Sequence, residues 1–376
     1  MGKRIVVKIG SNVLTRDNGK LDVTRISSIV DQTVWLRLQG YEVILVSSGS
    51  VAGGRGELSP GRRLDSVQQR QLYSAVGQVR LIHTYYGFFR DHGISVGQIL
   101  TMKENFSSRR EYLNQRSCME VMLANGVIPI VNENDTVSVT ELMFTDNDEL
   151  SGLIASMMDA DTLVILSNVD GVYRDVDDGA AAGGDDVAVL PVRREVIRTV
   201  SPSDDISGYI SREKSGFGRG GMTAKCAIAR KAAAEGIRVI IANGRRAGIL
   251  TDIFGGAGDV PFTEFVPAAG EVSNVKKWIA HSGSFAKGVI HVNAKAAGAL
   301  RGERAVSLLM VGVTAVDGDF EEGDIVTIVD DRGDAVAVGR SAYGKSEAVS
   351  LIGCHDVRPI VHYDYMYMTS HDANNV

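Results

Sequence analysis

Short runs of consecutive apolar residues recur through the first two thirds of the chain. Each run is rich in Val and Ile and too short for a helix, so each predicts a strand that is buried on both faces. The five runs are Arg4–Ile9, Glu42–Val46, Val127–Val131, Thr162–Leu166 and Arg238–Ile241.

Longer amphipathic stretches lie between these runs and predict helices. They are Val23–Leu38, Ser66–Arg90, Arg109–Ala124, Asp148–Met158 and Thr223–Ala234. Several are followed by a glycine that is typical of a helix C-cap: Gly40, Gly93, Gly126 and Gly236. Strands that alternate with helices predict an open, mainly parallel α/β sheet with helices on both faces.

The pattern changes near Pro267–Asn274, and short strand-like runs separated by turns follow. These runs are Gly288–Val292, Ser307–Val316, Asp324–Val329, Ala335–Val338 and Ala348–Ile352. They predict a small all-β domain. We therefore expect a first domain over 1–266, a second over 276–366 and a frayed polar tail over 367–376.

Each of the five predicted strands of the first domain ends in small or polar residues. The ends read Lys8-Ile9-Gly10-Ser11, Ser47-Ser48-Gly49-Ser50, Asn132-Glu133-Asn134-Asp135, Ser167-Asn168-Val169-Asp170-Gly171 and Asn243-Gly244. Any strand must turn, so one such end carries little information. Open α/β sheets bind ligands at the carboxyl ends of their strands, and five such ends together favour one polar crevice.

The Gly-rich segment from Gly216 to Lys225 is the strongest local signal in the chain. It contains a formal GxGxxG, but no strand precedes it, and it lacks the Gly-Lys-Ser/Thr of a phosphate-binding P-loop. A glycine run that enters a helix exposes backbone N–H groups at a positive terminus, which suits an anion, and Lys225 would add a full charge there. The alternative is a flexible loop with a surface lysine.

Lys8 is unusual because it lies inside an otherwise apolar strand, next to Gly10 and Ser11. Buried lysines are rare unless they are paired. The two readings are a lysine at the crevice that contacts phosphate and an edge-strand lysine that faces water.

A cluster of acids and amides forms the third candidate. One of the carboxylates in Asp146-Asn147-Asp148 is explained by capping of the following helix. Capping does not explain the second cluster, Asn132-Glu133-Asn134-Asp135, just upstream. Together the two clusters supply carboxylates and amides for binding an ammonium group and for orienting cations.

Composition narrows the class of protein. The formal net charge of −6 is a poor basis for binding nucleic acid, which usually needs a basic face. The three cysteines are far apart and form no CxxC, and the seven histidines show no ligand spacing, so neither a disulfide framework nor a metal site is expected. The apolar stretch at the start is too short for a signal or membrane segment, which favours the cytoplasm.

With these residues in hand, the chain resembles the amino-acid kinase family, and within it the kinases that phosphorylate glutamate. The resemblance covers almost the whole chain. It rests on Lys8-Ile9-Gly10-Ser11, the segment Ser48 to Arg55, Ala75-Val76-Gly77-Gln78, Val96-Gly97-Gln98, the segment Pro129 to Asp135, Asp146-Asn147-Asp148 and Gly220-Gly221-Met222-Thr223-Ala224-Lys225. The part from Lys276-Lys277-Trp278-Ile279 onward resembles a PUA domain. Departures from the family pattern are Asn12, Ser167-Asn168 and Arg219.

The resemblance implies that the γ-carboxylate of L-glutamate attacks the γ-phosphate of ATP, giving glutamyl 5-phosphate for proline synthesis, with proline as feedback inhibitor. A carboxylate is already ionised at neutral pH, so no general base is needed. By resemblance, Lys8 and Lys225 would neutralise the transferring phosphoryl group, and Asp148 would orient them. Mg²⁺ would arrive with ATP, and a homo-oligomer is expected.

The resemblance also assigns the two ligands to separate residues. Glutamate would be held by Ser48, Asp135 and Asn147. ATP would be held by Lys8, Ser167, Asn168, Arg219, Gly220, Gly221, Met222, Thr223, Ala224 and Lys225.

Acetylglutamate kinase and aspartokinase are the nearest alternatives within this fold. Asp135 suits a free ammonium, which an acetylated amine does not offer, and the all-β second domain does not fit an aspartokinase. RNA binding by the second domain is the alternative from another class. From Lys276 to Val376 there are ten Lys and Arg against thirteen Asp and Glu, a net charge of −3, which disfavours RNA.

Overall fold

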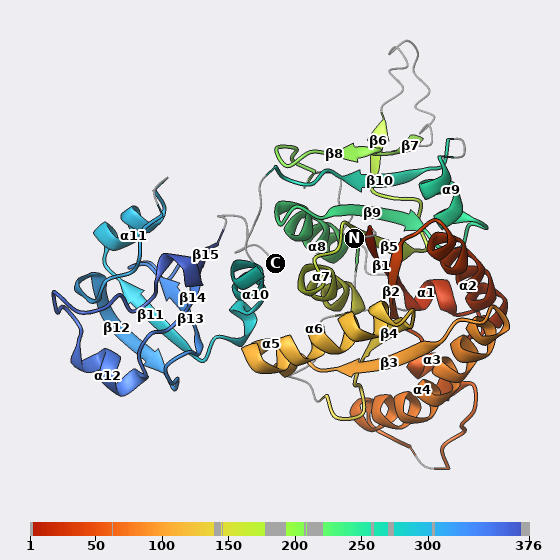
Figure 1. Ribbon diagram of the computed structural model, residues 1–376, viewed down its shortest axis with the longest axis horizontal. Helices are drawn as coiled ribbons and strands as arrows, with labels where there is room; N and C mark the ends of the chain where they lie inside the picture. Colours follow the sequence, from red (N-terminus) through yellow and green to blue (C-terminus); the bar gives the residue numbers. More distant parts are fainter. Residues whose placement is uncertain are drawn as a thin grey trace, which may run out of the picture. The chain divides into compact units, whose positions relative to one another are not determined.

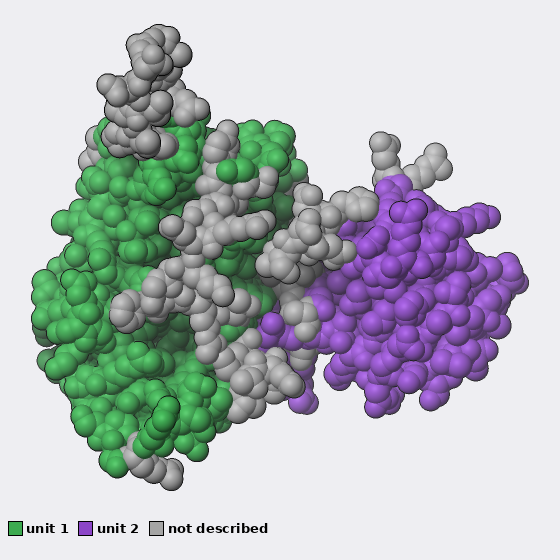
Figure 2. Space-filling model, turned by 180° about the vertical axis from the view of Figure 1, so that it is seen from behind, with its two compact units in different colours: residues 1–102, 117–270 green, residues 103–116, 271–376 purple. Residues whose placement is uncertain are grey.

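The computed structural model describes residues 3–61, 63–138, 144, 146–176, 193–206, 208, 221–256, 259–269, 274–302 and 305–369. The chain forms two compact units, which Figure 2 colours separately. The first contains residues 1–102 and 117–270, and the second contains residues 103–116 and 271–376. None of the described helices is long and apolar enough to span a bilayer.

The first unit is built on an eight-stranded sheet of order β3-β4-β2-β1-β5-β9-β10-β8 (Figure 1). The strands are β1 (Arg4–Ile9), β2 (Glu42–Ser47), β3 (Val96–Thr101), β4 (Ile128–Glu133), β5 (Thr162–Ser167), β8 (Thr199–Val200), β9 (Arg238–Asn243) and β10 (Phe262–Phe265). All neighbours are parallel except β9 and β10. A separate hairpin joins β6 (Tyr173–Val176) to β7 (Arg193–Val196). The predicted mainly parallel sheet is confirmed.

Helices cover both faces of this sheet (Figure 1). The longer ones are α2 (Val23–Leu38), α4 (Ser66–Asp91), α6 (Arg109–Ala124), α7 (Asn147–Met157), α8 (Met222–Ala234) and α9 (Ile249–Gly255). The five predicted strands and five predicted helices are present, with ends that shift by two residues at most. The four predicted C-cap glycines all have positive φ, between 70° and 87°.

The alternation of side chains along β1 decides where Lys8 points. Ile5, Val7 and Ile9 belong to the core cluster that also holds the buried residues of α2, α4 and α9. Because successive side chains of a strand point to opposite faces, Lys8 lies on the other face, where α7 packs against β1. The core on one face therefore places the lysine on the other.

Two short helices follow the first two strands, and one of them is in backbone contact with α4. They are α1 (Ser11–Leu14) and α3 (Ser50–Arg55). A Cβ added to Gly77 would lie 1.7 Å from the carbonyl oxygen of Ser50, and one added to Gly54 would lie 2.0 Å from that of Tyr73. Only glycine permits this approach, which fixes α3 directly after Ser48.

The second unit contains a five-stranded sheet of order β12-β11-β13-β14-β15. The strands are β11 (Gly288–Val292), β12 (Val313–Gly318), β13 (Ile325–Val329), β14 (Ala335–Arg340) and β15 (Met366–Met368). Three helices accompany them, α10 (Asn274–His281), α11 (Ala294–Leu300) and α12 (Lys345–Ser350). The small β domain is confirmed, but the predicted strand over Ala348–Ile352 was wrong, because short apolar runs do not separate strand from helix.

The first part of α6 and the short α5 (Glu104–Ser107) belong to the second unit. Nε1 of Trp278 donates to the carbonyl oxygen of Phe106 at 2.8 Å. The guanidinium of Arg109 lies over the rings of Tyr112 and Trp278, at 5.2 and 5.4 Å from their centroids. The sequence did not predict this excursion. Of the tail expected over 367–376, Tyr367 and Met368 pair with β14, and residues 370–376 lie outside the described residues.

Candidate functional site

A cavity of about 1100 Å³ opens at the carboxyl ends of the central strands of the first unit. Its lining includes residues that follow β1, β2, β4 and β5, so four of the five predicted polar strand ends meet there. The fifth end does not line it: Nδ2 of Asn243, at the end of β9, donates instead to Oδ1 of Asp170 at 3.1 Å. The helix starts of α7 and α8 also contribute to the lining.

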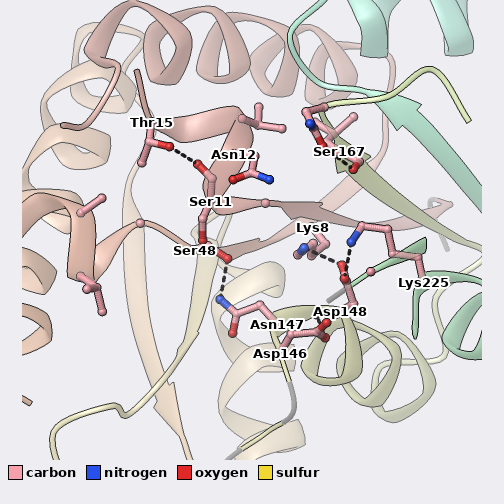
Figure 3. A pocket seen from close by; sticks show the side chains of 18 of the residues that line it. Lys8, Ser11, Asn12, Thr15, Ser48, Asp146, Asn147, Asp148, Ser167 and Lys225 are labelled. Atoms are coloured by element: carbon pink, nitrogen blue, oxygen red, sulfur yellow. Dashed lines mark hydrogen bonds and ion pairs between the residues drawn. The ribbon is translucent and has the colours of Figure 1, made fainter. Parts of the chain in front are cut away.

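Two lysines from distant parts of the chain meet on one carboxylate in this cavity (Figure 3). Nζ of Lys8 lies 2.5 Å from Oδ1 of Asp148, and Nζ of Lys225 lies 3.0 Å from Oδ2. All three are buried, with exposed fractions of 5%, 1% and 8% for Lys8, Asp148 and Lys225. Because β1 is a central strand, the alternative interpretation of Lys8 as an edge-strand lysine that faces water is wrong.

The electrostatics of this cluster leave a net positive charge. Burial disfavours an ionised Asp148, but the nearby Lys8 and Lys225 outweigh burial and hold the pKa of this carboxyl below its usual value. Lys8, Lys225 and Asp148 together carry one net positive charge, which the nearby Asp146 offsets above about pH 6, where its own carboxyl group ionises. Such a cluster is suited to an anion whose charge grows during a reaction.

Asp146 is the N-cap of α7, as capping predicts for one carboxylate of this segment. Its Oδ1 accepts from the backbone N–H groups of Asp148 and Glu149 at 2.8 and 3.1 Å. Its Oδ2 is buried and has no hydrogen-bond partner in the part of the chain that the structure describes. Burial, followed by repulsion from Asp148, raises the pKa of Asp146 to about 6.

We expect Asp146→Asn to stabilise the protein at alkaline pH. A folded-state pKa of about 6 exceeds the ordinary value of 3.8, so ionisation of Asp146 opposes folding above about pH 6. The asparagine keeps a capping oxygen and removes the charge, and the free energy of unfolding at pH 8 should rise by about 1–2 kcal/mol. Denaturant melts should show this gain shrink as the pH falls from 6 toward 4. A gain that does not depend on pH would contradict the assignment.

In a second cluster the acidic groups outnumber the basic ones. It lies where Arg70 of α4 contacts residues at the end of β4. Nε of Arg70 donates to Oδ1 of Asp135 at 2.7 Å, and Nη2 donates to Oε2 of Glu133 at 2.8 Å and to Asp135. Oδ2 of Asp135 accepts from the hydroxyl of Ser50 at 3.2 Å. Among the described residues, these two carboxylates and the one guanidinium sum to one negative charge, which suits an ammonium group.

Ser48 and Asn147, both expected to hold the acceptor, contact each other in this cavity (Figure 3). Nδ2 of Asn147 donates to Oγ of Ser48 at 2.9 Å and to Oδ1 of Asn132 at 3.0 Å. Ser48 follows β2 and Asn147 opens α7, so the parallel sheet brings together residues that are 99 positions apart.

The residues expected to hold the nucleotide divide into three groups. Lys8, Ser167, Asn168, Gly221, Met222 and Lys225 line the cavity. Thr223 and Ala224 lie in the first turn of α8, whose N-cap is Gly221. Arg219 and Gly220 lie outside the described residues.

Arg70 is a cavity residue that the sequence did not reveal. It lies in the second turn of a helical stretch, with no adjacent signal, and 65 residues separate it from Asp135. The guanidinium of Arg70 reaches the cavity only because α4 packs beside the ends of the strands in the folded chain.

Two lysines that converge on a carboxylate at the strand ends of an α/β sheet are suited to binding an anion such as a phosphate group, and comparisons with known proteins identify the family. The model of the amino acid kinase family matches residues 3–243, and that of the PUA domain matches residues 288–363. The chain belongs to the amino acid kinase family, and within it to the glutamate 5-kinases.

Similar proteins of known name show that the chain belongs to the glutamate 5-kinases in particular. The chain is 56% identical to the glutamate 5-kinase of Bacteroides thetaiotaomicron, over 97% of this chain and 98% of that protein. It is 44% identical to the glutamate 5-kinase of Chlorobaculum tepidum, over 97% of each chain. The glutamate 5-kinase of Syntrophus aciditrophicus is 38% identical, over 96% of this chain and 91% of that protein.

Proposed function

We infer that this protein transfers the γ-phosphoryl group of ATP to the γ-carboxylate of glutamate, the first step of proline biosynthesis, and that it does so in the cavity of the first unit. Membership of the glutamate 5-kinases carries the reaction. The location of the reaction is inferred from the two lysines that contact Asp148 and from the separate cluster of opposite net charge around Asp135.

The cluster around Asp148 suits the transferring phosphoryl group, and the cluster around Asp135 suits the ammonium group of glutamate. The γ-carboxylate of glutamate is ionised at neutral pH and can attack without a general base. We assign Lys8 and Lys225 to the charge that accumulates on the transferring phosphoryl group, and we assign Asp148, which contacts both ammonium groups, to their positioning. Catalysis then consists of positioning and charge stabilisation.

The rest of glutamate is proposed to extend toward Asp135. Its ammonium group would meet the net negative charge of Asp135, Glu133 and Arg70. Ser48 and Asn147 lie on the wall of the same cavity and would hold the acceptor.

ATP is proposed to lie along Ser167, Asn168 and residues 219–225. Gly221 caps α8, a helix of 13 residues whose positive end suits phosphate groups. Mg²⁺ would come with ATP and keep most of its waters. Both oxygens of Asp148 are paired with lysines, so we propose that phosphate oxygens and water, rather than Asp148, hold the ion.

A comparison of acceptors tests the assignment. Glutamate should support ATP turnover and acetylglutamate should not, because an acetylated amine has no positive charge to set against Asp135. Initial rates of ADP formation with glutamate, acetylglutamate, aspartate and UMP give the answer directly. Equal turnover with glutamate and acetylglutamate would exclude the proposed acceptor site.

A homo-oligomer is proposed from an apolar stripe on α4. Leu72, Val79 and Tyr86 are spaced by seven residues, hence on one face of the helix, and are 38%, 67% and 48% exposed. Val79→Glu should shift the mass from light scattering toward the monomer, whereas Leu38→Glu, at an exposed site on α2, should not. A wild-type chain that is monomeric at micromolar concentration would contradict the proposal.

Two further proposals concern an inhibitor and the location, and RNA is left out as a partner. Proline shares the amino-acid head of glutamate and is proposed as a feedback inhibitor that competes at Asp135. RNA is not proposed as a partner, because the segment from Lys276 has a net charge of −3. A cytoplasmic location is proposed because the three cysteines are unpaired.

A further inference from the structure

A series of side-chain amides leads from α4 to the acceptor part of the cavity, and one backbone group fixes its direction. The backbone N–H of Glu133 lies 2.9 Å from one atom of the Asn132 amide, which must be the oxygen because an N–H can only donate. The other amide atom of Asn132 is therefore the nitrogen. It lies 2.9 Å from Gln78, whose facing atom must then be its oxygen Oε1.

The same reasoning extends to Asn147. Its amide atom 3.0 Å from Oδ1 of Asn132 must be the nitrogen, and this nitrogen also lies 2.9 Å from Oγ of Ser48. An amide nitrogen carries two hydrogens, and these two contacts use both. Asn147 can therefore offer a substrate only its oxygen, while Ser48 accepts from Asn147 and keeps its own O–H for donation.

These polarities correspond to the two charged groups of an amino acid. An amide oxygen can accept from an ammonium group, and a serine hydroxyl can donate to a carboxylate. If the Asn147 amide were turned by half a rotation, its NH₂ would face the ammonium and repel it. On the proposed function, the direction of the amides is thus a determinant of glutamate binding.

We propose that Gln78 is a positioning residue, which acts through Asn132 to fix the hydrogen-bond polarity of Asn147 and Ser48 and so favours an acceptor that carries an ammonium group. Gln78 lies on α4 and does not line the cavity. Asn132 is 2% exposed, so water cannot easily replace the oxygen of Gln78 as its partner. Without that oxygen, Nδ2 of Asn132 is left unsatisfied, or the amide turns and breaks its contact with Asn147.

Two substitutions at one position separate this role from packing. Gln78→Met keeps the length of the side chain and removes the acceptor oxygen, whereas Gln78→Glu keeps an acceptor. Gln68→Met is the matched control, because Gln68 is an exposed glutamine in the first turn of the same helix, and its side chain is hydrogen-bonded to the capping residue Asp65 and to no other described residue. The acceptors compared are glutamate and glutarate, which lacks the ammonium group.

For Gln78→Met, the KM for glutamate should rise about 10- to 100-fold, with kcat within about threefold and ATP binding unchanged. The kcat/KM for glutarate should fall much less, so discrimination between the two acceptors should shrink about tenfold or more. Gln78→Glu should restore the glutamate KM to within about threefold of wild type, and Gln68→Met should leave it unchanged. Thermal melts of each variant establish that it is folded.

Two results would overturn the inference. One is an unchanged glutamate KM in folded Gln78→Met. The other is a folded Gln78→Glu variant whose glutamate KM is about 10-fold or more above that of wild type, and this comparison holds even if the methionine variant does not fold. A wild-type protein without glutamate turnover would instead overturn the proposed function itself.

Discussion

Replacing Lys225 by Met should lower kcat about 100-fold or more, on the order of 3 kcal/mol of transition-state stabilisation. The ammonium group of Lys225 lies 3.0 Å from Oδ2 of Asp148 and reaches the cavity from the first turn of α8. It is buried, so bulk water and salt screen it weakly, and among the described residues Oδ2 of Asp148 forms no other ion pair that could replace it. The KM for glutamate should change much less, since the loss falls on the charge that develops during transfer.

The matched variant Lys225→Arg separates charge from packing. Arginine keeps the positive charge but cannot place it at the same point, so it should retain more activity than methionine, though less than lysine. Initial rates with saturating ATP and glutamate, on protein shown by thermal melts to be folded, measure this order. If Lys225→Met turned over within a few-fold of wild type, Lys225 would be a structural partner of Asp148 and no more.

Asp135→Ala should raise the KM for glutamate about 100-fold while kcat stays within a few-fold of wild type. The substitution removes the carboxylate proposed to meet the substrate ammonium, a loss on the order of 2–3 kcal/mol. Arg70 keeps its contact with Glu133, and its guanidinium would then repel the ammonium. A full titration of glutamate at saturating ATP measures the effect.

Asp148→Asn provides the contrast, because it should lower kcat and leave the glutamate KM nearly unchanged. Asp148 contacts both lysines, whereas Asp135 contacts Arg70 and Ser50. Indistinguishable kinetic changes in Asp135→Ala and Asp148→Asn would mean that the two carboxylates do not serve separate ends of the substrate.

The central part of the fold was predictable because burial on both faces produces continuous apolar runs. Strand β3 escaped this rule: it is an edge strand whose exposed positions include polar residues, and its apolar run is broken by Gly97 and Gln98. In the second unit, the run Ala348–Ile352 forms the end of α12 and the turn that follows it. Ala348 is buried and Val349 is exposed, and over five residues this alternation cannot be distinguished from that of a strand.

Site residues were predictable where their sequence neighbours reveal them, and they were not predictable where only the fold brings them to the site. A lysine in an apolar strand and an Asp-Asn-Asp at a helix start are visible in the sequence alone. Arg70 and Gln78 are ordinary residues of an amphipathic helix, 65 and 54 positions from the partners they contact. Their roles arise only because α3 and α4 are in backbone contact beside the strand ends.

The discontinuous second unit has a consequence for synthesis. Phe106 is made 172 residues before Trp278, whose indole N–H bonds to its carbonyl oxygen. At ordinary translation speeds of about 5–20 residues per second, the nascent segment waits on the order of 10–30 s for its partner. During that time Phe106 and Tyr112, both nearly fully buried in the finished protein, lack the indole that later packs beside Arg109. The second unit therefore cannot be completed on the ribosome as an independent late module, nor exchanged by a single cut in the gene.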